Sequence, residues 1–67
     1  MTVARVTEIS ATSTRGFEDA INAGLARATK TLENVRGAWV KEQSVAVNGD
    51  KVSEYKVNME VSFVLKD

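Results

Sequence analysis

The sequence predicts an α+β fold, a single βαββ domain spanning residues 1–67 in which a three-stranded antiparallel sheet wraps one helix. Three observations predict it. Apolar residues alternate with polar ones from Val52 to Leu65, as in a half-buried strand. They recur every three or four positions from Phe17 to Leu32, as in an amphipathic helix. The pair Asn48-Gly49 separates two strand-like segments, and Asn-Gly is the strongest short signal for a hairpin.

The first segment, Thr2 to Ser10, is rich in β-branched residues and predicts a strand. A helix is expected to start after it, because Ser13 or Thr14 carries a hydroxyl able to accept from the free amides of a first turn. Glu18 and Asp19 then place negative charge near the positive end of that helix.

The helix carries small residues on its apolar stripe, at Ala20, Gly24 and Ala28. A glycine inside a helix costs about 1 kcal/mol, and a close contact between helix and sheet offsets this cost. Beyond the helix, Asn34 or Gly37 is expected to take the left-handed conformation that ends a helix or begins a turn.

The second strand is predicted to start near Ala38 and to run to about Val47. Neither of its two alternating sets is purely apolar, which predicts a bulge around Gln43 or Ser44 that swaps the faces midway. A type I′ turn at Asn48-Gly49 then joins this strand to the third one as a long antiparallel hairpin.

The third strand defines the two faces of the sheet. One alternating set is predicted to face the helix and consists of Tyr55, Val57, Met59, Val61, Phe63 and Leu65. The other set is polar and consists of Glu54, Lys56, Asn58, Glu60 and Ser62. Because one helix covers one face only, we expect subunits or ligands to meet on the other face.

The length of the chain predicts a homo-oligomer. A chain of 67 residues buries only about 60% of the surface that its unfolded form exposes. Small domains usually compensate with disulfides, a structural metal or oligomerisation. The sequence has neither Cys nor His, so oligomerisation is the route that remains.

Charge and hydropathy argue against two classes of partner. Nine basic and nine acidic residues cancel, so the chain lacks the positive charge that nucleic-acid binding requires. No apolar run approaches the roughly 20 residues of a membrane span, and no basic segment followed by an apolar stretch opens the sequence. We therefore expect a soluble, cytoplasmic protein.

The residue types also argue against an enzyme, because the usual pairs of nucleophile and base need His or Cys. No catalytic residue is predicted. The carboxylates are candidates for holding a hard cation such as Ca²⁺ at a symmetry axis, although their spacing matches no loop motif. These are Glu42, Asp50, Glu54 and Glu60.

Three segments carry a resemblance to a known family. They are the turn Ala11-Thr12-Ser13, the run Ala26 to Leu32 closed by Asn34, and the pattern Gly-x-x-Val-x-x-Tyr-x-Val-x-x-x-Val-x-Phe-x-Leu from Gly49 to Leu65. With these spacings the chain resembles the dodecins over nearly its whole length. The resemblance implies a βαββ fold, a hollow homododecamer and binding of a flavin such as FMN or riboflavin.

The same resemblance implies an altered flavin site. Typical dodecins stack a tryptophan on the flavin at the position that Gly37 holds here, and they carry a glutamine after the aromatic residue of the third strand, where this chain has Lys56. In this respect the chain is similar to a divergent branch without the usual stacking tryptophan. Trp39 is expected on the same face as Gly37, roughly 6 to 7 Å further along the strand.

Two functions follow from the resemblance. In the first, a ligand-storing shell holds a small planar ligand at subunit junctions lined by Trp39, Lys56, Gln43 and Gly37. In the second, the shell is structural or binds a divalent cation and does not recognise flavin. The alternative role for Trp39 is packing between subunits, and the alternative for Lys56 is a solvated or salt-bridged strand lysine.

Overall fold

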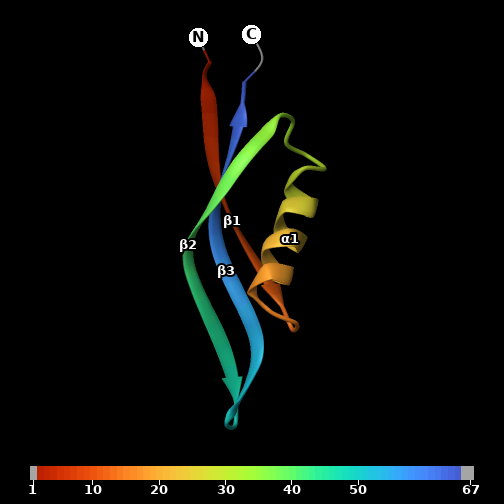
Figure 1. Ribbon diagram of the computed structural model, residues 1–67, viewed down its shortest axis with the longest axis vertical. Coiled ribbons are helices and arrows are strands. Elements are labelled where there is room, and N and C mark those ends of the chain that lie inside the picture. Colours follow the sequence, from red (N-terminus) through yellow and green to blue (C-terminus); the bar gives the residue numbers. More distant parts are fainter. Residues whose placement is uncertain (1, 66–67) are drawn as a thin grey trace.

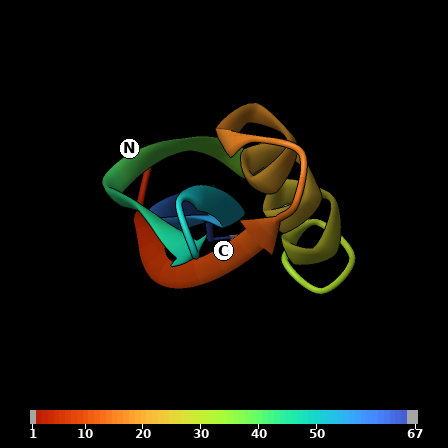
Figure 2. The same cartoon turned by 90° about the horizontal axis from the view of Figure 1, so that it is seen from below.

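A computed structural model describes residues 2–65 and confirms the predicted βαββ order. The elements are β1 (Ala4–Ser13), α1 (Phe17–Ala28), β2 (Val35–Asn48) and β3 (Lys51–Val64). The three strands form one sheet in the order β1-β3-β2, in which β3 lies between two antiparallel neighbours (Figure 1). The end-on view shows how strongly the sheet twists beside the helix (Figure 2).

The core lies between α1 and the middle of β3. Val57, Met59 and Val61 are fully buried, and Ala20 of α1 packs in one cluster with Val57 and Met59. Half-buried side chains of β1 and α1 complete it: Ile9, Ala11, Phe17, Ile21 and Leu25. The predicted helix-facing set is therefore confirmed over the middle of β3, whereas Leu65 lies beyond the strand and is exposed.

Gly24 allows α1 to approach the sheet closely, as predicted. A Cβ at this position would lie 2.5 Å from the Cε of Met59 and 3.1 Å from the Cβ of Ala11. Phe17, at the start of the helix, packs edge-to-face on Tyr55 with ring centroids 5.1 Å apart. Contacts at both places fix the helix against β1 and β3.

The start of α1 differs from the prediction. Its N-cap is Gly16, and within the described residues no side chain caps it, so the prediction of a Ser13 or Thr14 cap was wrong. Ser13 lies in β1 instead, because that strand continues beyond Ser10 and pairs with β3 as far as Tyr55. The Ser13 hydroxyl still holds the first turn by donating to Asp19 Oδ2 at 2.6 Å.

The helix ends at Ala28, one turn before Leu32. The Ala28 carbonyl accepts from the backbone amides of both Thr31 and Leu32, which closes the turn. Asn34 then adopts a φ of 61°, so one of the two predicted left-handed positions is confirmed, while Gly37 has no positive φ.

Strand β2 starts at Val35, three residues earlier than predicted, and contains three register shifts. The shift between Val40 and Glu42 makes Lys41 the extra residue, so the bulge lies two residues before the predicted Gln43. The other two shifts occur between Val35 and Gly37 and between Ala46 and Val47. The faces of β2 therefore cannot be read from simple alternation.

The hairpin is confirmed, but its turn differs from the predicted type. Asn48 pairs with Lys51, so Gly49 and Asp50 occupy the two central positions. Gly49 has a φ of 69°, and Asp50 is not among the positive-φ residues of the described chain. Glycine at the first central position is the requirement of a type II′ turn, whereas type I′ requires positive φ at both.

The hairpin extends beyond the rest of the molecule. Pairing between β1 and β3 stops at Tyr55, so the hairpin beyond it has two strands only and projects past the start of α1 (Figure 1). The principal dimensions are 51 × 19 × 13 Å. Within residues 2–65, no helix is long and apolar enough to cross a membrane.

Candidate functional site

The sheet face turned away from α1, here called the open face, carries the candidate site. Directly opposed residues of antiparallel strands share a face, and the face alternates along each strand. Since Val57, Met59 and Val61 face the helix, their alternates on β3 face away from it. Four rows cross the open face in the order β1, β3, β2: Val6-Ser62-Gly37, Glu8-Glu60-Trp39, Ser10-Asn58-Glu42 and Thr12-Lys56-Ser44.

Trp39 is the large aromatic residue of this face. It lies opposite Glu60, and 51% of its surface is exposed. Gly37 occupies the neighbouring row, where its carbonyl accepts from Ser62 Oγ at 3.3 Å. A Cβ at Gly37 would touch only Ser62 Oγ, at 3.6 Å. One side of the indole is thus bordered by a position without a side chain.

Lys41 crosses the open face because the bulge turns its side chain out of the regular alternation. Its Nζ lies 3.2 Å from Glu8 Oε1 and 3.6 Å from Glu60 Oε1. Glu8 and Glu60 are directly opposed, and like charges in such a pair repel each other. Its hydrogen bond to Glu8, and then the charge of that carboxylate, raise the pKa of Lys41 above the ordinary 10.5.

A hydrogen-bonded chain forms the next row. Ser10 Oγ donates to Asn58 Oδ1 at 2.7 Å, and Asn58 Nδ2 donates to Glu42 Oε1 at 3.1 Å. These two hydrogen bonds connect all three strands and fix the orientation of the Asn58 amide. The open face therefore places oriented acceptors and one ammonium beside an exposed indole.

The structure brings together only part of the predicted ligand site. Trp39 and Gly37 lie in adjacent rows, whereas Lys56 lies two rows from Trp39, roughly 13 Å along β3. Gln43 is opposite Val57 and therefore faces the helix side of the sheet. The bulge at Lys41 is the reason, since it shifts every following residue of β2 to the other face.

Sequence reasoning missed Lys41, Glu8 and the Ser10-Asn58-Glu42 row. Their sequence signal is weak, because the pairing depends on where the bulge lies. Of the candidate cation ligands, Glu42 and Glu60 are on the open face, Glu54 is opposite Ala46, and Asp50 is in the turn. Among residues 2–65, no three acidic side chains come together as a metal site.

Comparison with known proteins gives the family. The sequence model of the Dodecin family matches residues 3–66. The dodecin of Thermus thermophilus is 43% identical over 60 residues, which cover 90% of this chain and 87% of that protein. The calcium dodecin of Mycobacterium tuberculosis is 33% identical over 66 residues, covering 98% and 93%.

Solved structures of dodecins have the same fold as this chain. A crystal structure of a mutant of the T. thermophilus dodecin superposes with a TM-score of 0.94 at 40% identity, covering all of both chains. The calcium-chelating calcium dodecin of M. tuberculosis, crystallised with a calcium-binding site, gives a TM-score of 0.82 at 34% identity, over 96% of this chain and 91% of that one.

One expectation is not supported by these findings, namely the similarity to a branch without the stacking tryptophan, since this chain carries Trp39 on its open face. The fold, the family match and the relatives otherwise agree with one another. The chain belongs to the dodecin family, whose members are non-enzymatic binding proteins and whose architecture implies assembly as a homo-oligomer.

Proposed function

We propose that this dodecin-family protein forms a hollow homododecamer that stores or sequesters a small planar ligand, a flavin such as FMN or riboflavin, in the cytoplasm. The observation that carries the proposal is the half-exposed Trp39 on the open face, beside the side-chain-free Gly37. In this site Trp39 stacks on the ligand from a position one row away from Gly37.

Stacking supplies the main attraction. Offset stacked aromatic pairs contribute about 0.5–1.5 kcal/mol beyond the area that they bury. Gly37 leaves space at the edge of the indole, so a flat ring can slide across the row that Ser62 and Gly37 form. The oriented Asn58 amide and the Glu42 carboxylate then offer polar partners to the edge of the ring.

Assembly completes the site. Ligand pockets bury about 70–90% of a ligand's surface, which one open sheet face cannot do. A second copy of the chain therefore supplies the other wall. Gln43 and Lys56 contribute to the same ligand only from another copy, because Gln43 faces the helix side and Lys56 lies two rows from Trp39.

The alternative function is a shell that binds a divalent cation. It is supported by the 33% identical calcium dodecin of M. tuberculosis. The described residues favour the planar ligand, because Lys41 already places a positive charge between Glu8 and Glu60. Calcium binding by the wild-type protein in calorimetry, together with no flavin binding, would favour this alternative.

Flavin fluorescence tests the proposal. Purified protein is titrated into FMN and into riboflavin, and we expect saturable quenching that is lost in Trp39→Ala and partly kept in Trp39→Phe. Val3→Ala is the matched control, since Val3 is exposed and precedes β1, outside the four rows of the open face. Unchanged flavin emission at high protein concentration would contradict flavin binding. Light scattering coupled to size exclusion tests the dodecamer separately.

A further inference from the structure

The side chain of Glu60 lies in the middle of the open face, between an aromatic and an acidic neighbour. Glu60 is directly opposite Trp39 of β2 and directly opposite Glu8 of β1. Directly opposed residues have Cβ atoms about 4.5–5.5 Å apart, so the Glu60 carboxylate is within reach of the indole. The direction that this side chain takes therefore decides how much of the indole is free to stack on a ligand.

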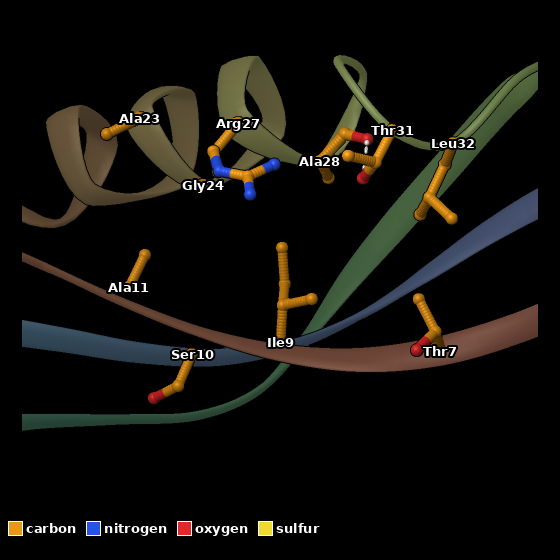
Figure 3. A pocket seen from close by; sticks show the side chains of 10 residues that line it. All are labelled: Thr7, Ile9, Ser10, Ala11, Ala23, Gly24, Arg27, Ala28, Thr31 and Leu32. Atoms are coloured by element: carbon orange, nitrogen blue, oxygen red, sulfur yellow. Dashed lines mark hydrogen bonds between the residues drawn. The ribbon is translucent and has the colours of Figure 1, made fainter.

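Glu8 lies on the same face as Glu60. The view into the groove between α1 and β1 shows Ile9 and Ala11 of β1 pointing toward the helix, whereas Ser10 points away from it (Figure 3). Because side chains alternate along a strand, Glu8 shares the open face with Ser10. The carboxylates of Glu8 and Glu60 thus face each other on the open face, where like charges repel.

Lys41 approaches this acidic pair from one side of the indole. It follows Trp39 by two residues on β2, whereas Gly37 precedes Trp39 by two, so Lys41 and Gly37 lie on opposite sides of the indole. Lys41 Nζ donates to Glu8 Oε1 at 3.2 Å and lies 3.6 Å from Glu60 Oε1. The ammonium therefore holds the Glu60 carboxylate on its own side and leaves the space beside Gly37 open.

We propose that Lys41 is a positioning residue of the ligand site, which keeps the Glu60 carboxylate away from the stacking surface of Trp39. The inference rests on the proposed function, because it concerns the same site. Lys41 does not touch the ligand in this role. It acts through Glu60, which the repulsion by Glu8 would otherwise drive to another position.

The space beside Gly37 is the position that a released Glu60 side chain would take. A Cβ at Gly37 would meet only Ser62 Oγ, at 3.6 Å, so the space is free. The Ser62 hydroxyl, which donates to the Gly37 carbonyl at 3.3 Å, can rotate and donate to a carboxylate instead. A planar ring that slides across this row would then cover an ionised carboxylate, and burying an unpaired charge is costly. Loss of Lys41 therefore weakens binding of the ring.

Titration of riboflavin, followed by flavin fluorescence, tests this role. Lys41→Met is expected to bind riboflavin about fivefold more weakly than the wild type, as the loss of two exposed ion pairs would allow. Lys41→Arg keeps the charge and is expected to retain the wild-type affinity. Lys30→Met is the matched control, because it removes the same charge beyond the end of α1 and should leave the affinity unchanged.

A second background separates positioning from a general effect on the fold. In Glu60→Ala no carboxylate can move beside the indole, so adding Lys41→Met should cause no further loss of riboflavin affinity. An equal loss in both backgrounds overturns the inference, as does wild-type affinity in Lys41→Met or the same loss in Lys41→Arg. These outcomes leave flavin binding itself intact. A wild-type protein that binds no riboflavin overturns the proposed function and the inference together.

Discussion

Trp39 lies directly opposite Glu60 across the β2–β3 ladder, and the bulge two residues further along β2 brings the Lys41 ammonium to 3.6 Å from the same Glu60 carboxylate. The indole of the open face is therefore bordered by a fixed ion pair on one side and by Gly37 on the other. The candidate site is therefore centred on the indole of Trp39 and not on position 37.

Introducing an aromatic residue at position 37 is expected to strengthen flavin binding. A Cβ there meets only Ser62 Oγ at an ordinary 3.6 Å and no positive φ opposes it, so the sheet accommodates Gly37→Trp. We expect about a tenfold lower dissociation constant for riboflavin, equivalent to about 1.4 kcal/mol, from the added stacking. Gly37→Leu is the control for bulk alone, and equal affinities of the two variants would contradict a stacking site.

The ion pair at Lys41 predicts a pH dependence of stability. The folded state raises the pKa of Lys41 above that of the unfolded chain, so the contribution is complete below about pH 10 and is lost as the pH rises through the raised value. As the pH rises from about 9 to above the ordinary pKa of 10.5, the free energy of unfolding should fall more in the wild type than in Lys41→Met.

Chemical denaturation at fixed protein concentration measures this difference. Because Lys41→Met leaves Glu8 opposite Glu60, the double variant Glu8→Gln/Lys41→Met serves as the control without like-charge repulsion. Parallel pH profiles of the wild type and both variants would show that the ion pair does not stabilise the fold.

Gly24→Ala is expected to destabilise the protein despite the better helix propensity of alanine. The propensity gain is about 1 kcal/mol, whereas crowding a packed core costs about 1–3 kcal/mol. The new methyl group would meet Met59 Cε at 2.5 Å and Ala11 Cβ at 3.1 Å. We expect a net loss of about 1 kcal/mol, measured by denaturation, and smaller losses when the background is Met59→Leu. An increase in stability would show that α1 can move away from the sheet.

Asn34 joins the helix connection to the C-terminal end of β3. It has a φ of 61°, its carbonyl accepts from the Val64 amide at 3.1 Å, and its side chain donates to the Val64 carbonyl at 3.4 Å. Asn34→Ala should lower the free energy of unfolding by about 1–2 kcal/mol, because alanine disfavours this conformation. Asn34→Gly keeps the conformation and should cost less; equal losses would assign the effect to the hydrogen bond alone.

The regular elements were predictable because their periodicity depends on local burial. The strand side of the core was indicated by the alternation of Val57, Met59 and Val61. The helix side was indicated by the small residues Ala20 and Gly24 of α1. The predicted limits of the strands and of the helix were less accurate. Residues 11–13 have a hydroxyl-rich composition that favours a turn, but pairing with β3 extends β1 through them.

The candidate site was harder to predict than the fold. Trp39 and Gly37 could be assigned to one face from their spacing alone. Gln43 could not, because the bulge at Lys41 depends on the pairing of β2 with a strand far away in the sequence. The same bulge creates the contacts of Lys41 with Glu8 and Glu60, which involve all three strands and leave no local pattern.

The emission of Trp39 tests the proposed site most directly, because Trp39 is the single tryptophan of the chain. Riboflavin is titrated into the assembled protein, and N-acetyltryptophanamide at the same absorbance corrects for light absorption and collisions. The account predicts saturable quenching of Trp39 emission that follows the quenching of the flavin itself. Trp39 emission that matches the free tryptophan amide throughout the titration, while the flavin is quenched, would place the ligand elsewhere and contradict the account.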